Sequence, residues 1–171
     1  MCRFLLLPLL VAATVFSTSC GTYTLGTRSK PPFSSIALES IENTTLAPQV
    51  QAILHQQLAE TLSRENNIHF TQPASAAAVL RVRLTAYEHS LASTNPDDTM
   101  RGNAFTITLR ARCTLVNAST KKPWFTEREV SASHVAHVPI TGGFSAVEYQ
   151  TLPILTRELA RKIRNTITDT W

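Results

Sequence analysis

Basic residues at short, regular spacings are the first feature of this sequence that indicates chemistry. Two pairs of arginines two residues apart and one pair of adjacent lysines make up the set: Arg81, Arg83, Arg110, Arg112, Lys121 and Lys122. A guanidinium group presents a fork of N–H donors that matches a phosphate or a carboxylate. Residues i and i+2 of a strand share one face, so each arginine pair is expected on a single surface. These residues are therefore candidates for binding an anionic ligand.

A structural role for the same arginines is the alternative. If the strands on either side of the turn at 117–122 pair in the simplest register, Arg112 faces Glu127 and Arg110 faces Glu129. Each such pair would contribute about a few tenths of a kcal/mol to stability, as exposed ion pairs usually do. The glutamates would then neutralise the surface, and the lysine pair would simply be solvated in its turn. Both interpretations stay open from the sequence.

Arg128 does not fit that simplest register. It falls on the face that the alternation of apolar residues assigns to the core. A charged side chain is rarely buried without a partner. The pattern therefore predicts either an edge position for Arg128 or a β-bulge in the pairing.

Cys20 is the second candidate for chemistry, and its setting indicates a membrane tether. Arg3 precedes the apolar run at 4–16, which is shorter than the roughly 20 residues of a membrane-spanning helix. Small residues follow directly before Cys20, and Gly21 comes after it. This order predicts a signal peptide at 1–19 that is removed. Cys20 then becomes the N-terminus and carries diacylglycerol and an N-acyl lipid, which together give a stable anchor.

Two alternatives remain for Cys20. One is a disulfide with Cys113 in an oxidising compartment. The other is an ordinary signal peptide without lipidation, which Ser17 leaves open because lipoprotein signals usually have an aliphatic residue at that position. Cys113 alternates onto the apolar face of its strand, so it is expected to be a buried small hydrophobic residue.

Signals for catalysis are weak. His134 and His137 are three residues apart on an expected strand, which places them on opposite faces and makes a shared metal ion unexpected. The sequence has no HExxH, GxSxG, phosphate-binding loop or CxxC motif. We therefore expect no enzyme, no cofactor other than the lipid on Cys20, no metal site and no nucleic-acid partner. An enzyme with an unrecognised site remains an alternative.

Composition and periodicity predict the elements that position these residues. The 171 residues are 43% hydrophobic and 16% charged with a net charge of +4, which is typical of one globular domain. Alternating residues predict strands at 34–41, 79–89, 103–116 and 123–133, a short strand near 68–70, and a loop at 90–101.

Two helices are expected to cover the sheet. The first begins at Pro48 and has apolar residues four apart: Val50, Leu54, Leu58 and Leu62. The second has Pro153 in its first turn and an apolar stripe of Leu152, Leu155, Leu159, Ile163 and Ile167. Its polar flank carries Arg157, Arg161, Lys162 and Arg164. We predict an α+β fold, a two-layer sandwich with two helices packed on one face of a mostly antiparallel four-stranded sheet. Residues 20–33 form a lipidated N-terminus and linker, and 34–171 form one domain.

Five segments in order resemble the LptE-type lipoproteins, the small outer-membrane subunits of lipopolysaccharide assembly. They are "CGTYTLG" (20–26), "IENTTLAP" (41–48), "AAAVLRVRLTAY" (76–87), the hairpin at 105–125 with its tryptophan, and the helix "ILTRELARKIRNTI" (154–167). The resemblance covers nearly all of the chain after the signal peptide.

The resemblance implies a function as well as a fold. Members of that family are not enzymes; they lie inside a large β-barrel translocon of the outer membrane, assist its assembly and bind lipopolysaccharide. The protein would then be lipid-anchored at the outer membrane, facing the periplasm or inside the barrel lumen. Arg81 and Arg83 would be the first candidates for lipopolysaccharide phosphates, followed by Lys121 and Lys122, with Arg110 and Arg112 on the same surface. The alternative is another periplasmic outer-membrane lipoprotein that acts as an assembly or scaffold factor without a lipid ligand.

Overall fold

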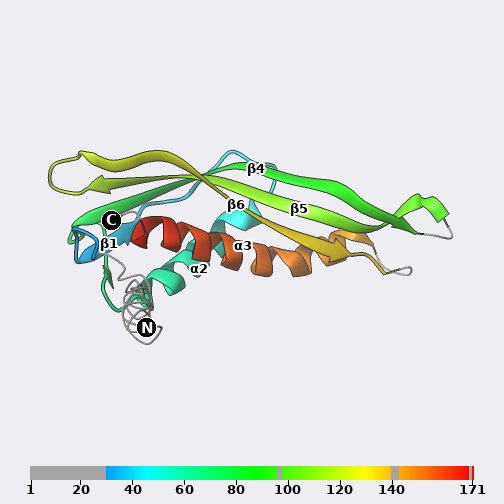
Figure 1. Ribbon diagram of the computed structural model, residues 1–171, viewed down its shortest axis with the longest axis horizontal. Coiled ribbons are helices and arrows are strands. Elements are labelled where there is room, and N and C mark those ends of the chain that lie inside the picture. Colours follow the sequence, from blue (N-terminus) through cyan, green and yellow to red (C-terminus); the bar gives the residue numbers. More distant parts are fainter. Residues whose placement is uncertain (1–29, 96–97, 140–142, 170) are drawn as a thin grey trace, which may run out of the picture.

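A computed structural model describes residues 30–95, 98–139, 143–169 and 171 of the chain (Figure 1). The signal peptide, Cys20 and most of the linker lie outside these residues. The predictions of cleavage and lipidation are therefore not tested by the structure.

The described strands form one mixed sheet. They are β1 (Ser35–Leu38), β2 (Glu42–Asn43), β3 (His69–Phe70), β4 (Ala78–Asn95), β5 (Asp98–Asn117) and β6 (Pro123–His137). The order across the sheet is β3-β1-β4-β5-β6, and β2 lies beside β4. β4, β5 and β6 are antiparallel, whereas β1 and β2 run parallel to β4. The α+β class is confirmed, but the strand count of four is too low, because β2 and β3 are two-residue strands at the margin of the sheet.

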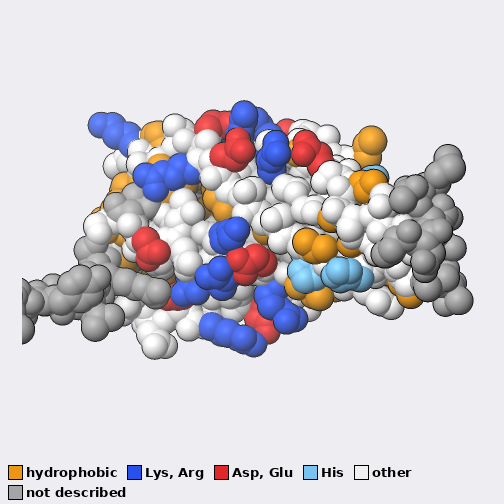
Figure 2. All heavy atoms as spheres, turned by 45° about the vertical axis from the view of Figure 1, so that its right-hand side comes forward, with side chains coloured by type: hydrophobic (Ala, Val, Ile, Leu, Met, Phe, Trp, Pro, Cys, Tyr) orange, Lys and Arg blue, Asp and Glu red, His pale blue; other side chains and the backbone are white. Residues whose placement is uncertain are grey.

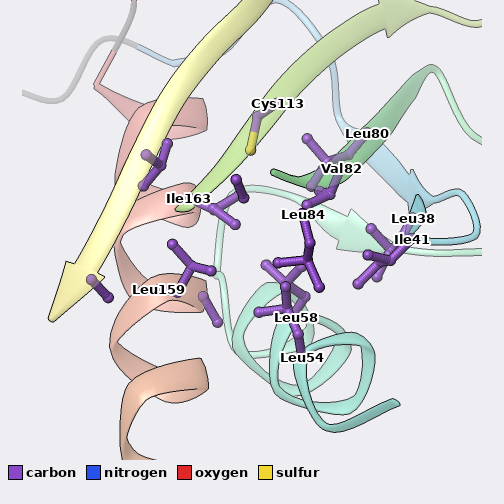
Figure 3. Close-up of a cluster of buried hydrophobic side chains, with 14 of the residues drawn as sticks. Leu38, Ile41, Leu54, Leu58, Leu80, Val82, Leu84, Cys113, Leu159 and Ile163 are labelled. Carbon is purple, nitrogen blue, oxygen red and sulfur yellow. The ribbon is translucent and has the colours of Figure 1, made fainter. Parts of the chain in front are cut away.

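Two helices, α2 (Gln49–Ser63) and α3 (Phe144–Thr168), cover the same face of the sheet (Figure 1). All four apolar residues predicted for α2 are fully buried, and the five of the α3 stripe are at most 1% exposed. They meet the apolar face of β4 and β5, where Leu84 and Cys113 point toward the helices (Figure 3). The predicted two-layer arrangement is therefore the observed one.

Helix α3 begins nine residues before Pro153, so the prediction that this proline lies in the first turn is wrong. Proline lacks an N–H, so it cannot donate to the carbonyl of Tyr149 one turn earlier. The helix nevertheless continues through Pro153, and Tyr149, one turn earlier, is 69% exposed. Nearby, the hydroxyls of Thr151 and Thr156 donate to the carbonyls of Val147 and Leu152, each at 2.8 Å.

The loop predicted at 90–101 is instead the end of the β4–β5 hairpin. Ser90 pairs with Thr106, and Leu91 pairs with Phe105. Residues 88–93 are all exposed, so neither face of the strand is buried there. The alternation of apolar and polar residues that identifies a strand is consequently lost, although the backbone pairing continues.

A β-bulge shifts the pairing of β5 with β6. Leu115 faces Phe125, but Cys113 faces Arg128, and Glu127 between them has a positive φ of 51°. Arg128 is exposed, and its guanidinium lies 4.6 Å from the centroid of the Phe125 ring. Both alternatives predicted for Arg128 hold, because the pairing contains a bulge and β6 is the last strand in the sheet order. The predicted facing pairs are wrong by two residues, since the bulge places Glu129 opposite Arg112 and Ser131 opposite Arg110.

The β5–β6 turn contains a second residue with positive φ, Lys121, at 58°. The side chain of Asn117 accepts the N–H groups of Ser119 and Thr120 at 2.9 Å, which holds the turn in this conformation. Because glycine adopts positive φ without steric cost, Lys121→Gly should raise the free energy of unfolding by about 1 kcal/mol in urea titrations. Lys122→Gly is the matched control and should lower it, since Lys122 has no positive φ. Equal losses in both variants would contradict this account of the turn.

Candidate functional site

The arginine face is the exposed side of the sheet opposite the helices, and it carries Arg81, Arg83, Arg110 and Arg112. Alternation along β4 and β5 places all four there, as predicted. Arg83 lies directly opposite Arg112 in the register. Three of the four, all but Arg110, line one shallow groove of about 280 Å³. The structure therefore brings the predicted arginines together.

Every arginine of this face forms an ion pair with a glutamate. The pairs are Arg81–Glu39 (2.5 Å), Arg83–Glu42 (2.7 Å), Arg83–Glu127 (3.8 Å), Arg112–Glu127 (3.2 Å) and Arg110–Glu88 (3.4 Å). Glu127 reaches from β6 to both Arg83 and Arg112, which compensates two like charges that face each other. The hydrogen bond from Arg83 to Glu42 raises the pKa of that guanidinium.

The arginine face is consequently close to electrically neutral. The groove is lined by three arginines and three glutamates, whose charges cancel. An incoming phosphate would have to compete with carboxylates that already accept the guanidinium donors. The sequence indicated Glu127 as a neutralising residue, but Glu39, Glu42 and Glu88 were not foreseen. Binding of lipopolysaccharide by these arginines remains a prediction.

Lys121 and Lys122 lie apart from the arginine face, at the tip of the β5–β6 hairpin. Both are exposed, and neither lines the groove. The tip is at the end of the sheet near β1 and the C-terminus (Figure 1). The six predicted basic residues therefore do not form one site.

An aromatic cluster at this same end fixes where the linker joins the domain. The ring of Phe33 lies 5.0 Å from Trp124 and 6.0 Å from Trp171, and the two tryptophans are 6.1 Å apart. The indole N–H of Trp171 donates to the carbonyl of Ile167 at 2.7 Å. The chain that leads from Cys20 therefore enters the domain beside the β5–β6 hairpin.

Cys113 is buried, as predicted from the alternation. Its side chain is fully excluded from solvent and points into the core (Figure 3), and burial raises the pKa of its thiol to about 12. The thiolate is the reactive form, so a neutral thiol in the core is inert.

We expect Cys113 to resist thiol reagents in the native protein. In a chain with Cys2→Ser and Cys20→Ser, dithionitrobenzoate at pH 8 should release almost no thionitrobenzoate until urea is added. A Ser131→Cys variant of that chain places a thiol at an exposed position of β6 and should react at once. Rapid native reaction of Cys113 would show that the core opens locally.

Clusters of metal-ligating groups are absent from the part of the chain that the structure describes. No group of three His, Cys, Asp or Glu side chains there has a geometry that could hold a metal ion. His134 and His137 line different grooves. Among the described helices, none is long and apolar enough to cross a membrane.

A second basic surface, on the helical layer, was missed from the sequence. Arg157, Arg161 and Lys162 of α3 were expected only as a polar flank. In the structure they line a groove of about 420 Å³ between α3 and β6. The available signal was the density of positive charge in residues 157–164, where four of eight residues are Arg or Lys.

Comparisons with known proteins identify the fold. No family model and no curated protein sequence matches this chain. A hypothetical protein of Chlamydia trachomatis is similar over 80% of this chain and 96% of its own (TM-score 0.56, 10% identity). An uncharacterized lipoprotein of Nitrosomonas europaea is similar over 86% of this chain and 90% of its own (TM-score 0.56, 14% identity). A putative lipoprotein of Caulobacter crescentus is similar over 75% of this chain and 88% of its own (TM-score 0.52, 16% identity). The chain thus has a fold that occurs in small bacterial proteins, two of which are described as lipoproteins.

Proposed function

We propose that this protein is a lipid-anchored, non-enzymatic subunit of the outer-membrane translocon for lipopolysaccharide. In this role it is tethered through Cys20, docks into a large β-barrel partner, supports the assembly of that barrel and binds lipopolysaccharide. Support comes from the sequence around Cys20, from the ordered segments that resemble the LptE-type lipoproteins, and from the fold shared with proteins described as lipoproteins.

The observation that carries the proposal is the one-sided sheet. α2 and α3 both cover one face, and the described residues leave the arginine face open (Figure 1). That face has abundant polar groups but little net charge, because its arginines are ion-paired. The interior of an outer-membrane barrel is polar. A polar, nearly neutral sheet face that is exposed to solvent is better suited to contact the polar inner wall of a barrel than to contact lipid chains.

Affinity purification from outer membranes tests the partner. The tagged protein, extracted in mild detergent, should bring down a large β-barrel, and mass spectrometry should find lipid on Cys20. A Cys20→Ala variant is the control for anchoring and should leave the membrane fraction. Recovery of the lipidated protein without any barrel would contradict the translocon proposal.

A scaffold factor without a lipid ligand is the second candidate, and the ion pairs of the arginine face favour it. Under the first proposal, Arg81→Ala with Arg83→Ala should weaken lipopolysaccharide binding. Glu39→Gln with Glu42→Gln removes the shortest ion pair of each of these two arginines, leaving Arg83 only Glu127 at 3.8 Å, and should strengthen it. Lipopolysaccharide binding that responds to neither pair of substitutions would favour the scaffold.

A further inference from the structure

Two grooves beside α3 are lined by more cations than carboxylates, unlike the groove of the arginine face. Two grooves flank Arg157: one of about 450 Å³ between α2 and α3, and one of about 420 Å³ between α3 and β6. The cations that line them, here called the α3 basic band, are Arg64, Arg157, Arg161, Lys162 and Arg164. The glutamates that line them are Glu60, Glu65 and Glu158. Five cations against three carboxylates leave two positive charges uncompensated.

Most of the uncompensated positive charge lies in the α3–β6 groove, where three cations face one glutamate. Both Nε and an Nη of Arg161 donate to Glu158, at 3.0 and 2.7 Å. Lys162 Nζ donates to the carbonyl of Ser131 on β6 at 2.8 Å, which fixes it at the groove wall, and it lies 4.0 Å from Glu158. Within the described chain, Arg157 takes part in no ion pair. Glu158 is therefore the ion-pair partner of both Arg161 and Lys162, while Arg157 has no carboxylate partner in the described chain.

An exposed apolar side chain lies within this charged surface. Ile154, Arg157 and Arg161 are spaced i, i+3 and i+7, so they share one side of α3. Ile154 is 49% exposed and lines the groove together with His134 of β6. In Figure 2, Lys and Arg side chains gather beside histidine and hydrophobic side chains on the face shown. Basic residues beside an exposed apolar side chain are a combination that can contact both the headgroups and the acyl boundary of a lipid interface.

We propose that the α3 basic band binds the phosphate-bearing headgroups of anionic lipids at a membrane surface. Arg157 and Arg161 supply forked donors for phosphate, Lys162 adds a point charge, and Ile154 reaches the boundary between headgroups and acyl chains. Negative surface potential attracts each cation that lies near it. The inference concerns other residues than the arginine face and requires neither a barrel partner nor lipopolysaccharide.

A fluorophore at position 154 tests the contact directly. The lipidated protein with Ile154→Cys is labelled there, because Cys113 is buried and an acylated Cys20 has no free thiol; mass spectrometry verifies one dye per chain. It is then reconstituted in vesicles of phosphatidylcholine with or without phosphatidylglycerol. Emission should shift to the blue only with phosphatidylglycerol. The charge is then removed by combining Arg157→Gln, Arg161→Gln and Lys162→Gln. This triple variant should lower the fraction of protein whose dye contacts the vesicle by about tenfold or more.

The control removes positive charge at exposed residues outside both grooves and outside the arginine face. Lys30→Gln with Arg128→Gln should leave the emission shift unchanged, and urea midpoints verify that both variants fold. An equal loss in the two variants, or no shift in either kind of vesicle, would overturn the proposal; the second result would point to an acidic protein partner. Abolition of the shift by inorganic phosphate at matched ionic strength would overturn the lipid assignment in favour of a free phosphate ion.

Discussion

Leu159→Ala should lower the free energy of unfolding by about 3 kcal/mol. Leu159 lies in the middle of α3, is fully buried, and points from the helix into the cluster of buried side chains (Figure 3). Truncation removes apolar surface from the core and leaves a cavity that a close-packed interior fills poorly, so buried Leu→Ala changes cost about 2–5 kcal/mol. Urea unfolding followed by circular dichroism measures the loss. The grooves beside α3 depend on the same docking, so the variant should also weaken lipid contact.

Leu46→Ala is the matched control for this prediction. The substitution is chemically identical, but Leu46 is fully exposed just before α2. Its effect should stay within about 0.5 kcal/mol, as is usual for surface positions. A loss at Leu46 comparable to that at Leu159 would mean that the burial of α3 against the sheet is not what stabilises the domain.

The core was predictable because it depends on local spacing. Apolar residues every three or four positions identified the buried face of α2 and α3, and alternation identified the buried faces of β4 and β5. Each pattern arises because one face of an element meets the core and the other meets solvent. At residues 88–93 of the long hairpin both faces are exposed to solvent, so the alternation ends there and the sequence predicts a loop in place of the strand.

Features that depend on one extra residue or on distant partners were not predictable in the same way. The bulge at Glu127 moved the β5–β6 register by two residues, and only the misfit of Arg128 gave a hint of it. The carboxylates that accept hydrogen bonds from Arg81 and Arg83, Glu39 and Glu42, come from segments more than 40 residues earlier in the chain. A sequence shows which arginines share a face, but not which carboxylates the fold brings to them.

This distinction decides which basic residues are available for a ligand. The four arginines with the most regular spacing, on β4 and β5, are compensated by glutamates from neighbouring elements. The cations of α3 that line the α3–β6 groove are compensated only in part, because one carboxylate, Glu158, serves both Arg161 and Lys162, and Arg157 takes part in no ion pair within the described chain. The hydrogen bond from Arg161 holds the pKa of Glu158 below its usual range, so this glutamate stays charged and still leaves a positive excess. Charge available for binding therefore follows from tertiary pairing and not from spacing in the sequence.

Glu65→Gln should destabilise the protein by about 2 kcal/mol through the ion pair that joins the two helices. Glu65 lies just after α2, and its carboxylate accepts from Arg164 of α3 at 2.8 Å; the side chains are only 17% and 20% exposed. Nε of Arg164 is buried and makes no hydrogen bond among the described residues, so the guanidinium depends on this carboxylate. Replacement by glutamine leaves a largely buried charge without its counter-ion, which is costly at low dielectric. Urea titration at neutral pH measures the loss.

Glu60→Gln supplies the control, because Glu60 pairs with Arg64 near the end of α2 but at an exposed position. Those side chains are 48% and 76% exposed, so water screens the pair and its removal should cost less than about 0.5 kcal/mol. Adding Arg164→Gln to Glu65→Gln removes the unpaired charge as well and should recover part of the stability. A double variant that is less stable than Glu65→Gln alone would show that Arg164 stabilises the helix contact by packing of its aliphatic stem and not through its charge.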